Sequence, residues 1–193
     1  MQKSEKIPVL ATVLFLVTAI VAFVLAAVHS ITAPIIEKRA EEELMLARKA
    51  VLQEAESFSV YEGEASFSEE VAAVYIGETD GKQLGYCVNV KPIGYGGEIE
   101  MLVGITKAGK VCGVQILSMS ETAGLGSKAQ DASFLQQYIG KMIGQTLSVI
   151  KNGKPGEDEI AAVSGATVTS KAVTKGIQAA LDTAVLLEGE WAK

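Results

Sequence analysis

The chain has 193 residues, with 17 Lys or Arg, 23 Asp or Glu and a formal net charge of -6. Because binding to nucleic-acid phosphates needs a clustered basic face, this acidic balance with scattered lysines argues against a nucleic-acid partner. One histidine, His29, and two cysteines, Cys87 and Cys112, do not supply the clustered ligands of a zinc site or the four thiolates of an iron–sulfur cluster. A histidine-dependent catalytic relay needs its histidine in a folded site, whereas His29 lies at the end of an apolar segment. The length suits one domain of ordinary size plus an anchor.

An uncharged apolar run opens the chain at residues 7–28. At about 1.5 Å per residue this run is roughly 33 Å long, enough to cross the hydrocarbon core of a bilayer. A cleaved signal peptide is the alternative, but its apolar region is only about 7–15 residues long, and no convincing cleavage site follows here. We therefore predict a short N-terminus at residues 1–6 and an uncleaved transmembrane helix over 7–29.

The flanking charges give a prediction of orientation. Lys3 and Lys6 precede the apolar run, whereas Lys38 and Arg39 follow it only after a polar interval. Since basic residues in short flanks favour the cytoplasmic side, the N-terminus is expected in the cytoplasm. This predicts a single-pass protein of the cytoplasmic (inner) membrane whose C-terminal domain is extracytoplasmic.

A stalk helix is predicted over residues 30–56. Proline is tolerated in the first turn of a helix, so a new helix can begin at Pro34. Apolar residues then recur at spacings of three and four, which indicates one apolar stripe: Ile36, Ala40, Leu44, Ala47 and Val51. The charged residues 38–43 include opposite charges four positions apart and are most simply a solvated face.

Residues 57–193 are predicted to form an α+β domain, an antiparallel sheet with packed helices. Strand-forming residues at 71–76 and 84–90 flank Asp80-Gly81, a strong hairpin turn. A second hairpin joins 99–106 to 111–117 around residues 107–110. After a loop at 118–126, the pattern predicts a helix over 132–139, a polar turn at 151–158, a strand at 160–163 and a long amphipathic helix from about Thr167.

Both cysteines fall inside predicted strands. The simplest interpretation is that Cys87 and Cys112 are small buried hydrophobic residues. A disulfide is possible in an exported domain, but the spacing does not establish one.

The segment Ser164-Gly165-Ala166-Thr167 lies where the last strand gives way to the last helix. Helix N-termini expose unpaired N–H groups and a partial positive charge, so they bind phosphate readily. Gly165 and Ala166 allow close backbone approach, and Lys171 would add a positive charge nearby. The alternative is that Ser164 or Thr167 merely caps the helix, which is worth about 1 kcal/mol.

Four motifs follow one another along the chain: Ile31-Thr32-Ala33-Pro34 after one predicted membrane helix, Gly94-Tyr95-Gly96-Gly97, Glu121-Thr122-Ala123-Gly124-Leu125-Gly126 and Ser164-Gly165-Ala166-Thr167. In this order they resemble the FMN-binding domain found in the G subunit of the Rnf electron-transport complex and in the related C subunit of the sodium-pumping quinone reductase. The resemblance implies that a flavin transferase attaches FMN to Thr167 through a phosphoester bond. It also implies that the loop with Glu121, Thr122, Gly124 and Leu125 lines the flavin.

Two positions depart from the family pattern. Ala123 stands where the family usually has proline, and Ala161 stands where the transferase motif usually has aspartate. The resemblance thus leads us to expect an electron carrier with covalent FMN among the other subunits of a membrane complex. That complex would couple electron transfer between ferredoxin and NAD to movement of Na⁺ or H⁺.

Alternatives remain open at this point. Glu121 could instead be a loop carboxylate that faces water. The chain could be a flavin carrier like the C subunit of a Na⁺-pumping NADH:quinone reductase, or a membrane-anchored assembly module without a cofactor, since a stalk helix and an acidic surface fit that role equally well.

Overall fold

A computed structural model describes residues 6–63 and 65–191 of the chain. It divides into two compact units, Met1–Met45 and Leu46–Lys193, which are described separately. The first unit contains most of helix α1 (Lys6–Val51), and the last turns of α1 belong to the second unit. The second unit therefore begins before residue 57, the predicted start of the domain.

Helix α1 is the one helix among the described residues that is long and apolar enough to cross a membrane. The structure differs from the predicted pair of helices at 7–29 and 30–56, because α1 continues through Pro34 and ends at Val51. Proline removes one backbone hydrogen bond from a helix but does not have to end it.

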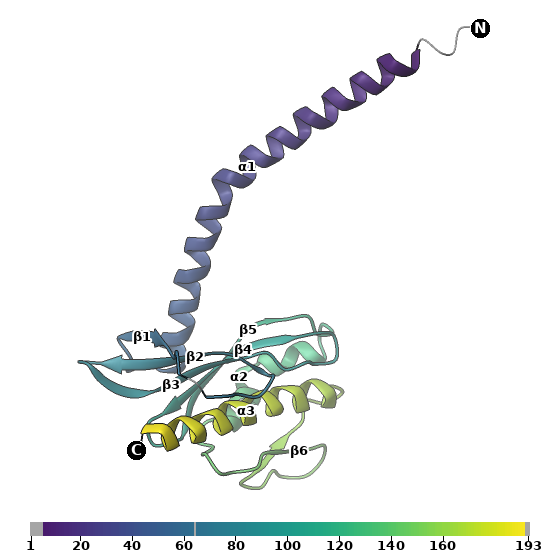
Figure 1. Cartoon of the computed structure of the whole chain (residues 1–193). Helices are drawn as coiled ribbons and strands as arrows, with labels where there is room; N and C mark the ends of the chain where they lie inside the picture. The colour runs from purple at the N-terminus through teal and green to yellow at the C-terminus, as the bar shows by residue number, and fades with distance from the viewer. Residues whose placement is uncertain (1–5, 64, 192–193) are drawn as a thin grey trace. The chain divides into compact units, whose positions relative to one another are not determined.

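A five-stranded antiparallel sheet forms the centre of the second unit, in the order β1-β2-β3-β4-β5 (Figure 1). The strands are β1 (Ser57–Val60), β2 (Val71–Thr79), β3 (Lys82–Val90), β4 (Ile99–Thr106) and β5 (Val111–Met119). The four predicted strands are confirmed, and two of the three connections between them are tight hairpins. Asp80 and Gly81 have φ of 51° and 70°, as a two-residue hairpin turn requires.

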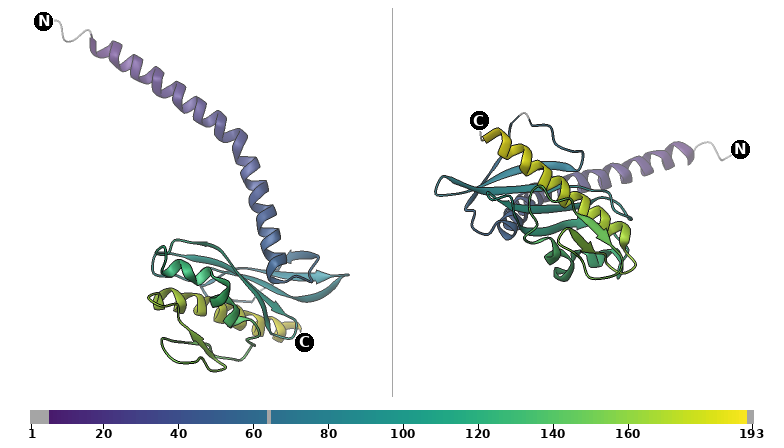
Figure 2. Two further views of the ribbon diagram at one scale, coloured as in Figure 1. Left: turned by 180° about the vertical axis from the view of Figure 1, so that it is seen from behind. Right: turned by 90° about the horizontal axis from the view of Figure 1, so that it is seen from below.

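Helix α3 (Thr167–Trp191) lies along one face of this sheet (Figures 1 and 2). Its apolar side closes the main core, where Val173, Ile177 and Leu181 are fully buried. Val88, Val90, Met101 and Val103 meet them from the central strands. The predicted amphipathic helix is thus confirmed, and its packing fixes the position of its N-terminus.

The last turns of α1 pack on the opposite face of the sheet. Ala47 and Val51 form a small buried cluster with Cys87 and Leu102. Gly104 and Gly113 make this approach possible, because an added Cβ would lie 2.2 Å and 2.4 Å from the carbonyl oxygen of Val51.

The segment between β5 and α3 is mostly irregular. It contains η1 (Gly126–Gln130), α2 (Ala132–Leu135) and η2 (Gln136–Tyr138), and then β6 (Ser148–Ile150), which pairs in parallel with β7 (Glu159–Ala161). The helix predicted over 132–139 is only one α-turn followed by a 3₁₀ turn. The strand predicted at 160–163 ends at Ala161, so the residues that follow are free to form a turn.

The two cysteines are not bonded to each other. Cys87 is buried, and burial raises the pKa of its thiol to about 12. Cys112 is exposed on β5, and its thiol donates a 3.2 Å hydrogen bond to the carbonyl of Val51. The small-hydrophobe interpretation is confirmed for Cys87 and wrong for Cys112.

Candidate functional site

A tight turn leads from β7 into α3. The amide of Ala166 donates a 3.0 Å hydrogen bond to the carbonyl of Val163, which closes a four-residue β-turn. Gly165 is the third residue of this turn and has φ of 76°. A type II turn needs positive φ at this position, so glycine is the residue that fits without strain.

Helix α3 then begins at Thr167 itself. The amides of Thr167, Val168 and Thr169 have no acceptor inside the helix, because the residues four positions earlier precede it. The hydroxyl of Ser170 accepts from the amide of Val163 at 3.0 Å and donates to the carbonyl of Ala166 at 2.9 Å. Ser170 therefore fixes the turn from inside, and Thr167 stays half-buried at its outer edge.

A cavity of about 560 Å³ lies beside this helix N-terminus. Cavities of about 300–1,000 Å³ are typical of sites for small molecules and cofactors. Three loops supply the lining: Tyr95 between β3 and β4; Glu121, Thr122, Leu125 and Gly126 after β5; and Gly165, Ala166, Thr167, Val168 and Thr169 at the start of α3. The motifs at residues 94–97, 121–126 and 164–167 are far apart in sequence, and residues of all three line this one cavity.

Glu121 joins two of these loops. Its Oε1 accepts hydrogen bonds from the amides of Tyr95 at 2.7 Å and Gly96 at 3.3 Å. Its Oε2 is buried and has no hydrogen-bond partner among the residues described. The alternative of a carboxylate facing water is therefore wrong, because Glu121 binds the backbone of the β3–β4 loop.

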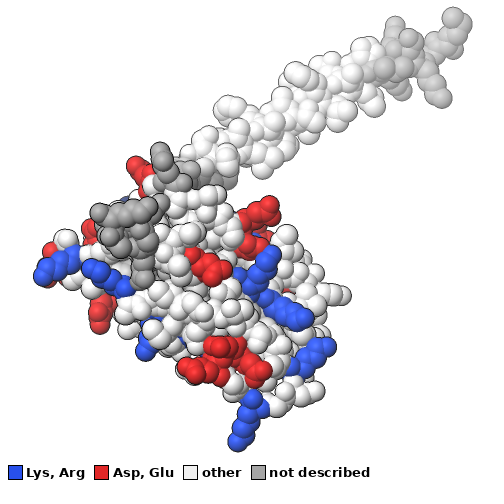
Figure 3. Space-filling view, turned by 60° about the horizontal axis from the view of Figure 1, so that its bottom comes forward, with Lys and Arg blue, Asp and Glu red and all other residues white. Residues whose placement is uncertain are grey.

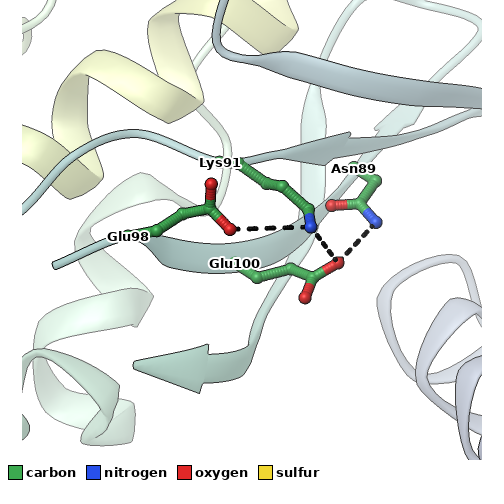
Figure 4. A network of polar contacts seen from close by, with 4 residues as sticks. All are labelled: Asn89, Lys91, Glu98 and Glu100. Carbon is green, nitrogen blue, oxygen red and sulfur yellow. Dashed lines mark hydrogen bonds and ion pairs between the residues drawn. The ribbon is translucent and has the colours of Figure 1, made fainter. Parts of the chain in front are cut away.

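A polar network ties the base of the same loop (Figure 4). Lys91, before the loop, lies 3.6 Å from a carboxylate oxygen of Glu98 and 3.5 Å from one of Glu100, both after it. Asn89 adds a 3.1 Å hydrogen bond to Glu100. The two ends of the loop are thus held together, and its tip carries Tyr95 to the cavity.

Six of the nine site residues predicted from sequence line the cavity: Glu121, Thr122, Leu125, Gly165, Ala166 and Thr167. Ser164, Gly124 and Lys171 are not among its lining residues. Ser164 occupies the exposed corner of the turn, and Gly124, with φ of 77°, shapes the 120–126 loop. Lys171 is one helical turn, about 5.4 Å, farther from the N-terminus of α3.

Lys171 instead lines a second cavity of about 400 Å³ on the flank of α3. There Lys175 pairs with Glu70, and this hydrogen bond lowers the pKa of the glutamate and raises that of the lysine.

Acidic and basic side chains are mixed over the face of the molecule that Figure 3 shows. The described residues contain no group of His, Cys, Asp or Glu that could hold a metal ion.

Sequence reasoning left four lining residues out of the site: Tyr95, Gly126, Val168 and Thr169. Tyr95 and Gly126 belong to motifs that the sequence had already marked, and Val168 and Thr169 directly follow Thr167. Thr169 is 1% exposed, so only part of it borders the cavity. For Val168 and Thr169, the signal available in the sequence was their place in the first turn of the predicted helix.

Ala161 lies just before the turn, at the end of β7. The side chain of Gln137 accepts from its amide at 2.8 Å and donates to its carbonyl at 3.2 Å. Ala161 shares a smaller cleft of about 280 Å³ with Gln137 and Asp131. Ala161 stands where the family motif usually has aspartate, and Gln137 binds both its backbone amide and its backbone carbonyl.

These residues fit a phosphorylated, partly apolar cofactor. The first amides of α3 suit a phosphate, and Gly165 and Ala166 leave its approach unobstructed. Leu125 and Val168 are 46% and 53% exposed at the cavity and offer apolar walls. Thr167, the first residue of α3, lines the same cavity.

Comparison with known proteins agrees with this chemistry. The family described as FMN-binding domain matches residues 94–182, which include all three cavity loops. The structure, together with this match, defines an FMN-binding domain joined to one apolar helix.

Curated relatives narrow the family further. The chain is 35% identical to the G subunit of the Na⁺-translocating ferredoxin:NAD⁺ oxidoreductase complex of Acetobacterium woodii, over 92% of this chain and 94% of the relative. It is 34% identical to the G subunit of the proton-translocating ferredoxin:NAD⁺ oxidoreductase complex of Clostridium ljungdahlii, over 86% and 85% of the two chains. The chain belongs to the family of these G subunits, which confirms the resemblance of its motifs.

A solved structure is also similar. The crystal structure of Shewanella oneidensis NqrC matches with a TM-score of 0.48 and 22% identity, over 68% of this chain and 66% of that one.

Proposed function

We propose that the chain is the flavin-carrying subunit of an ion-translocating ferredoxin:NAD⁺ oxidoreductase complex, with FMN attached to Thr167 through a phosphoester bond. The observation that carries the proposal is the place of Thr167, at the first residue of α3 and in the lining of a 560 Å³ cavity. Its relatives are subunits of such complexes, so the partners are the other subunits.

The residues divide the work of holding the cofactor. The amides that open α3 would bind the phosphate, and the Thr167 oxygen would anchor it covalently. Leu125, Val168 and Tyr95 would border the ring. When bound, the flavin would supply electron transfer, while the protein sets its position and potential. A covalent link keeps the local concentration high without tight binding, so one edge of the ring can stay accessible to partners.

Intact mass measurement tests the attachment. Protein produced together with a flavin transferase should show the mass of added FMN, and Thr167→Ala should abolish it. Thr169→Ala is the matched control, because it removes a neighbouring threonine hydroxyl and should keep the flavin. An unmodified wild-type mass would rule out covalent attachment.

We also propose that the domain lies outside the cytoplasm, as the charges that flank the apolar segment favour. Protease added to right-side-out vesicles should digest residues 46–193. Protection of the domain there, with digestion in inverted vesicles, would reverse the orientation.

A further inference from the structure

A smaller cleft lies beside the turn that leads to Thr167. Its volume is about 280 Å³, and its lining includes residues 161–163, which directly precede Ser164. We infer that a flavin transferase docks on this cleft and that Asp131, which lines it from another segment, supplies the carboxylate that the enzyme contacts. The inference rests on the proposed function, because it names the surface through which the same threonine would be modified.

Attachment of a flavin requires an enzyme to reach a half-buried threonine. In this step the hydroxyl oxygen of Thr167 would bond to the flavin-side phosphorus of a phosphoanhydride such as FAD. The P–O–P bond breaks, AMP leaves, and the hydroxyl proton is released, with no change in oxidation state. Because the attacking and leaving oxygens must lie nearly in line, the enzyme has to hold the chain close to Thr167. The 280 Å³ cleft lies next to the turn and offers such a hold.

The backbone before the turn is already occupied. The amides of residues 161–163 all donate to groups of the domain: to the side chain of Gln137 at 2.8 Å, to the carbonyl of Ile150 at 2.8 Å and to the hydroxyl of Ser170 at 3.0 Å. A partner that paired with these amides as an added strand would have to break these bonds. The side chains of the segment are two methyl groups and one isopropyl group, so charge in the cleft has to come from other residues.

Asp131 is fixed by its backbone and keeps a free carboxylate. It directly precedes α2, where an aspartate usually accepts a hydrogen bond from an amide of the first helical turn, but its side chain makes no such bond. Its backbone carbonyl accepts instead from the amides of Phe134 and Leu135, at 3.0 Å and 3.1 Å, and its own amide donates to the carbonyl of Lys128 at 3.1 Å. The residue is exposed, and its carboxylate is therefore available to a partner.

Two charged side chains line the cleft, Lys128 and Asp131, and two observations favour the carboxylate. The family motif usually has aspartate at the position of Ala161, and Ala161 lines the same cleft as Asp131. An enzyme that holds the anionic phosphates of a flavin dinucleotide also needs cationic groups beside the acceptor threonine, and these attract a carboxylate there. A carboxylate from residue 131 would then replace the one that residue 161 lacks.

Initial rates of flavin attachment test this assignment in the full-length protein in detergent. Protein produced without a transferase is incubated with a purified flavin transferase and FAD, at several concentrations of the chain, and covalent flavin is followed by in-gel fluorescence. Asp131→Asn removes the charge and keeps the shape, so the rate at low chain concentration should fall about two- to tenfold. The loss should be a higher KM for the chain with kcat near the wild-type value, because a docking group acts before the chemical step.

Two further variants separate a docking charge from a change of fold. Ala161→Asp in the Asp131→Asn background returns a carboxylate to the cleft and should restore most of the lost rate. Asp80→Asn is the matched control, because it makes the same substitution in the β2–β3 turn, where asparagine tolerates the φ of 51°, and Asp80 does not line the cleft. It should leave the KM at the wild-type value, and urea unfolding should give one midpoint for wild type, Asp131→Asn and Asp80→Asn.

Intact mass of the wild type separates the two proposals. If the wild type takes up no flavin, the proposed function fails, and this inference fails with it. If the wild type is modified and Asp131→Asn shares its KM, only the docking role of Asp131 is overturned. A raised KM that Ala161→Asp does not lower, or an equal rise in Asp80→Asn, would also overturn that role, because the enzyme would then not be contacting a carboxylate in this cleft.

Discussion

The two faces of the central sheet differ in how much they bury and in what they support. On the α3 face, a large core includes Val173, Ile177 and Leu181, and the same helix presents Thr167. On the other face, the last turns of α1 bury only a small cluster around Val51 and rest on two glycines. The core face thus fixes the start of α3 and the cavity that Thr167 lines, and the second face holds the last turns of α1, which are not among the residues that line this cavity.

Removing volume from the α3 core should have the largest effect. Ile177→Ala is expected to lower the free energy of unfolding by about 2–5 kcal/mol, because it leaves a cavity under α3. Urea unfolding in detergent measures this change. Val185→Ala, at a half-exposed position of the same helix, should change stability by less than about 0.5 kcal/mol. Equal losses in the two variants would contradict the burial of Ile177 in the core beneath α3.

Overfilling the second face should have a smaller effect and a different consequence. Gly113→Ala places a methyl group against the backbone of Val51 and should cost about 1–3 kcal/mol. The last turn of α1 should move away from the sheet, so trypsin should cleave after Lys49 faster than in the wild type. The fluorescence lifetime of the attached flavin should stay at the wild-type value. Gly156→Ala is the control, because its nearest neighbour would be at an ordinary 3.4 Å. A changed lifetime in Gly113→Ala would show that the faces are coupled.

A single buried hydroxyl on the core face gives a finer test. Tyr138 is fully buried, and its hydroxyl lies 2.8 Å from that of Thr174 on α3. Tyr138→Phe should cost about 1 kcal/mol, since Thr174 keeps its bond to the carbonyl of Ser170. A loss above the roughly 2–5 kcal/mol expected for Ile177→Ala would contradict this ranking.

The same tyrosine predicts a pH dependence. Burial raises the pKa of Tyr138, so the folded chain keeps a proton that the unfolded chain releases above about pH 10. Its contribution to stability is therefore complete below that pH and falls as the pH rises further. Urea unfolding between about pH 9 and about pH 11 should show a shallower decline in Tyr138→Phe than in the wild type.

The sequence predicted the elements whose signals are local. Strong hairpin turns located β2 to β5, and regular apolar spacing located α3. Strand β1 escaped prediction because Ser57–Val60 is short and half polar, and it forms by pairing with β2. Strand β6 likewise depends on its parallel partner β7, which follows it only after the polar turn.

The site divides in the same way. Thr167, Gly165 and the Glu121 loop were predictable from motifs, since each motif contains its own turn chemistry. The contact between Glu121 and the amides of Tyr95 and Gly96 joins segments 25 or 26 residues apart and has no local signal. Lys171 does not line the cavity. Which residues of the first helical turns line it depends on which loops cover the start of the helix, and the sequence gives no local signal for that.

Thiol reactivity gives the mildest test, and it probes the face of the sheet on which the last turns of α1 pack. Both cysteines lie on the α1 side of the sheet. Burial raises the pKa of the Cys87 thiol, and desolvation of the thiol also raises the pKa of Cys112, although that residue as a whole is exposed. Cys87 is fully buried, so iodoacetamide at about pH 8 should label Cys112 in the folded protein and reach Cys87 only after unfolding. In Gly113→Ala, labelling of Cys112 should accelerate because the Val51 carbonyl that accepts from its thiol is displaced. If Cys87 in the wild-type protein were labelled as fast as Cys112, the last turns of α1 would have to leave the sheet transiently, which would contradict stable packing on this face.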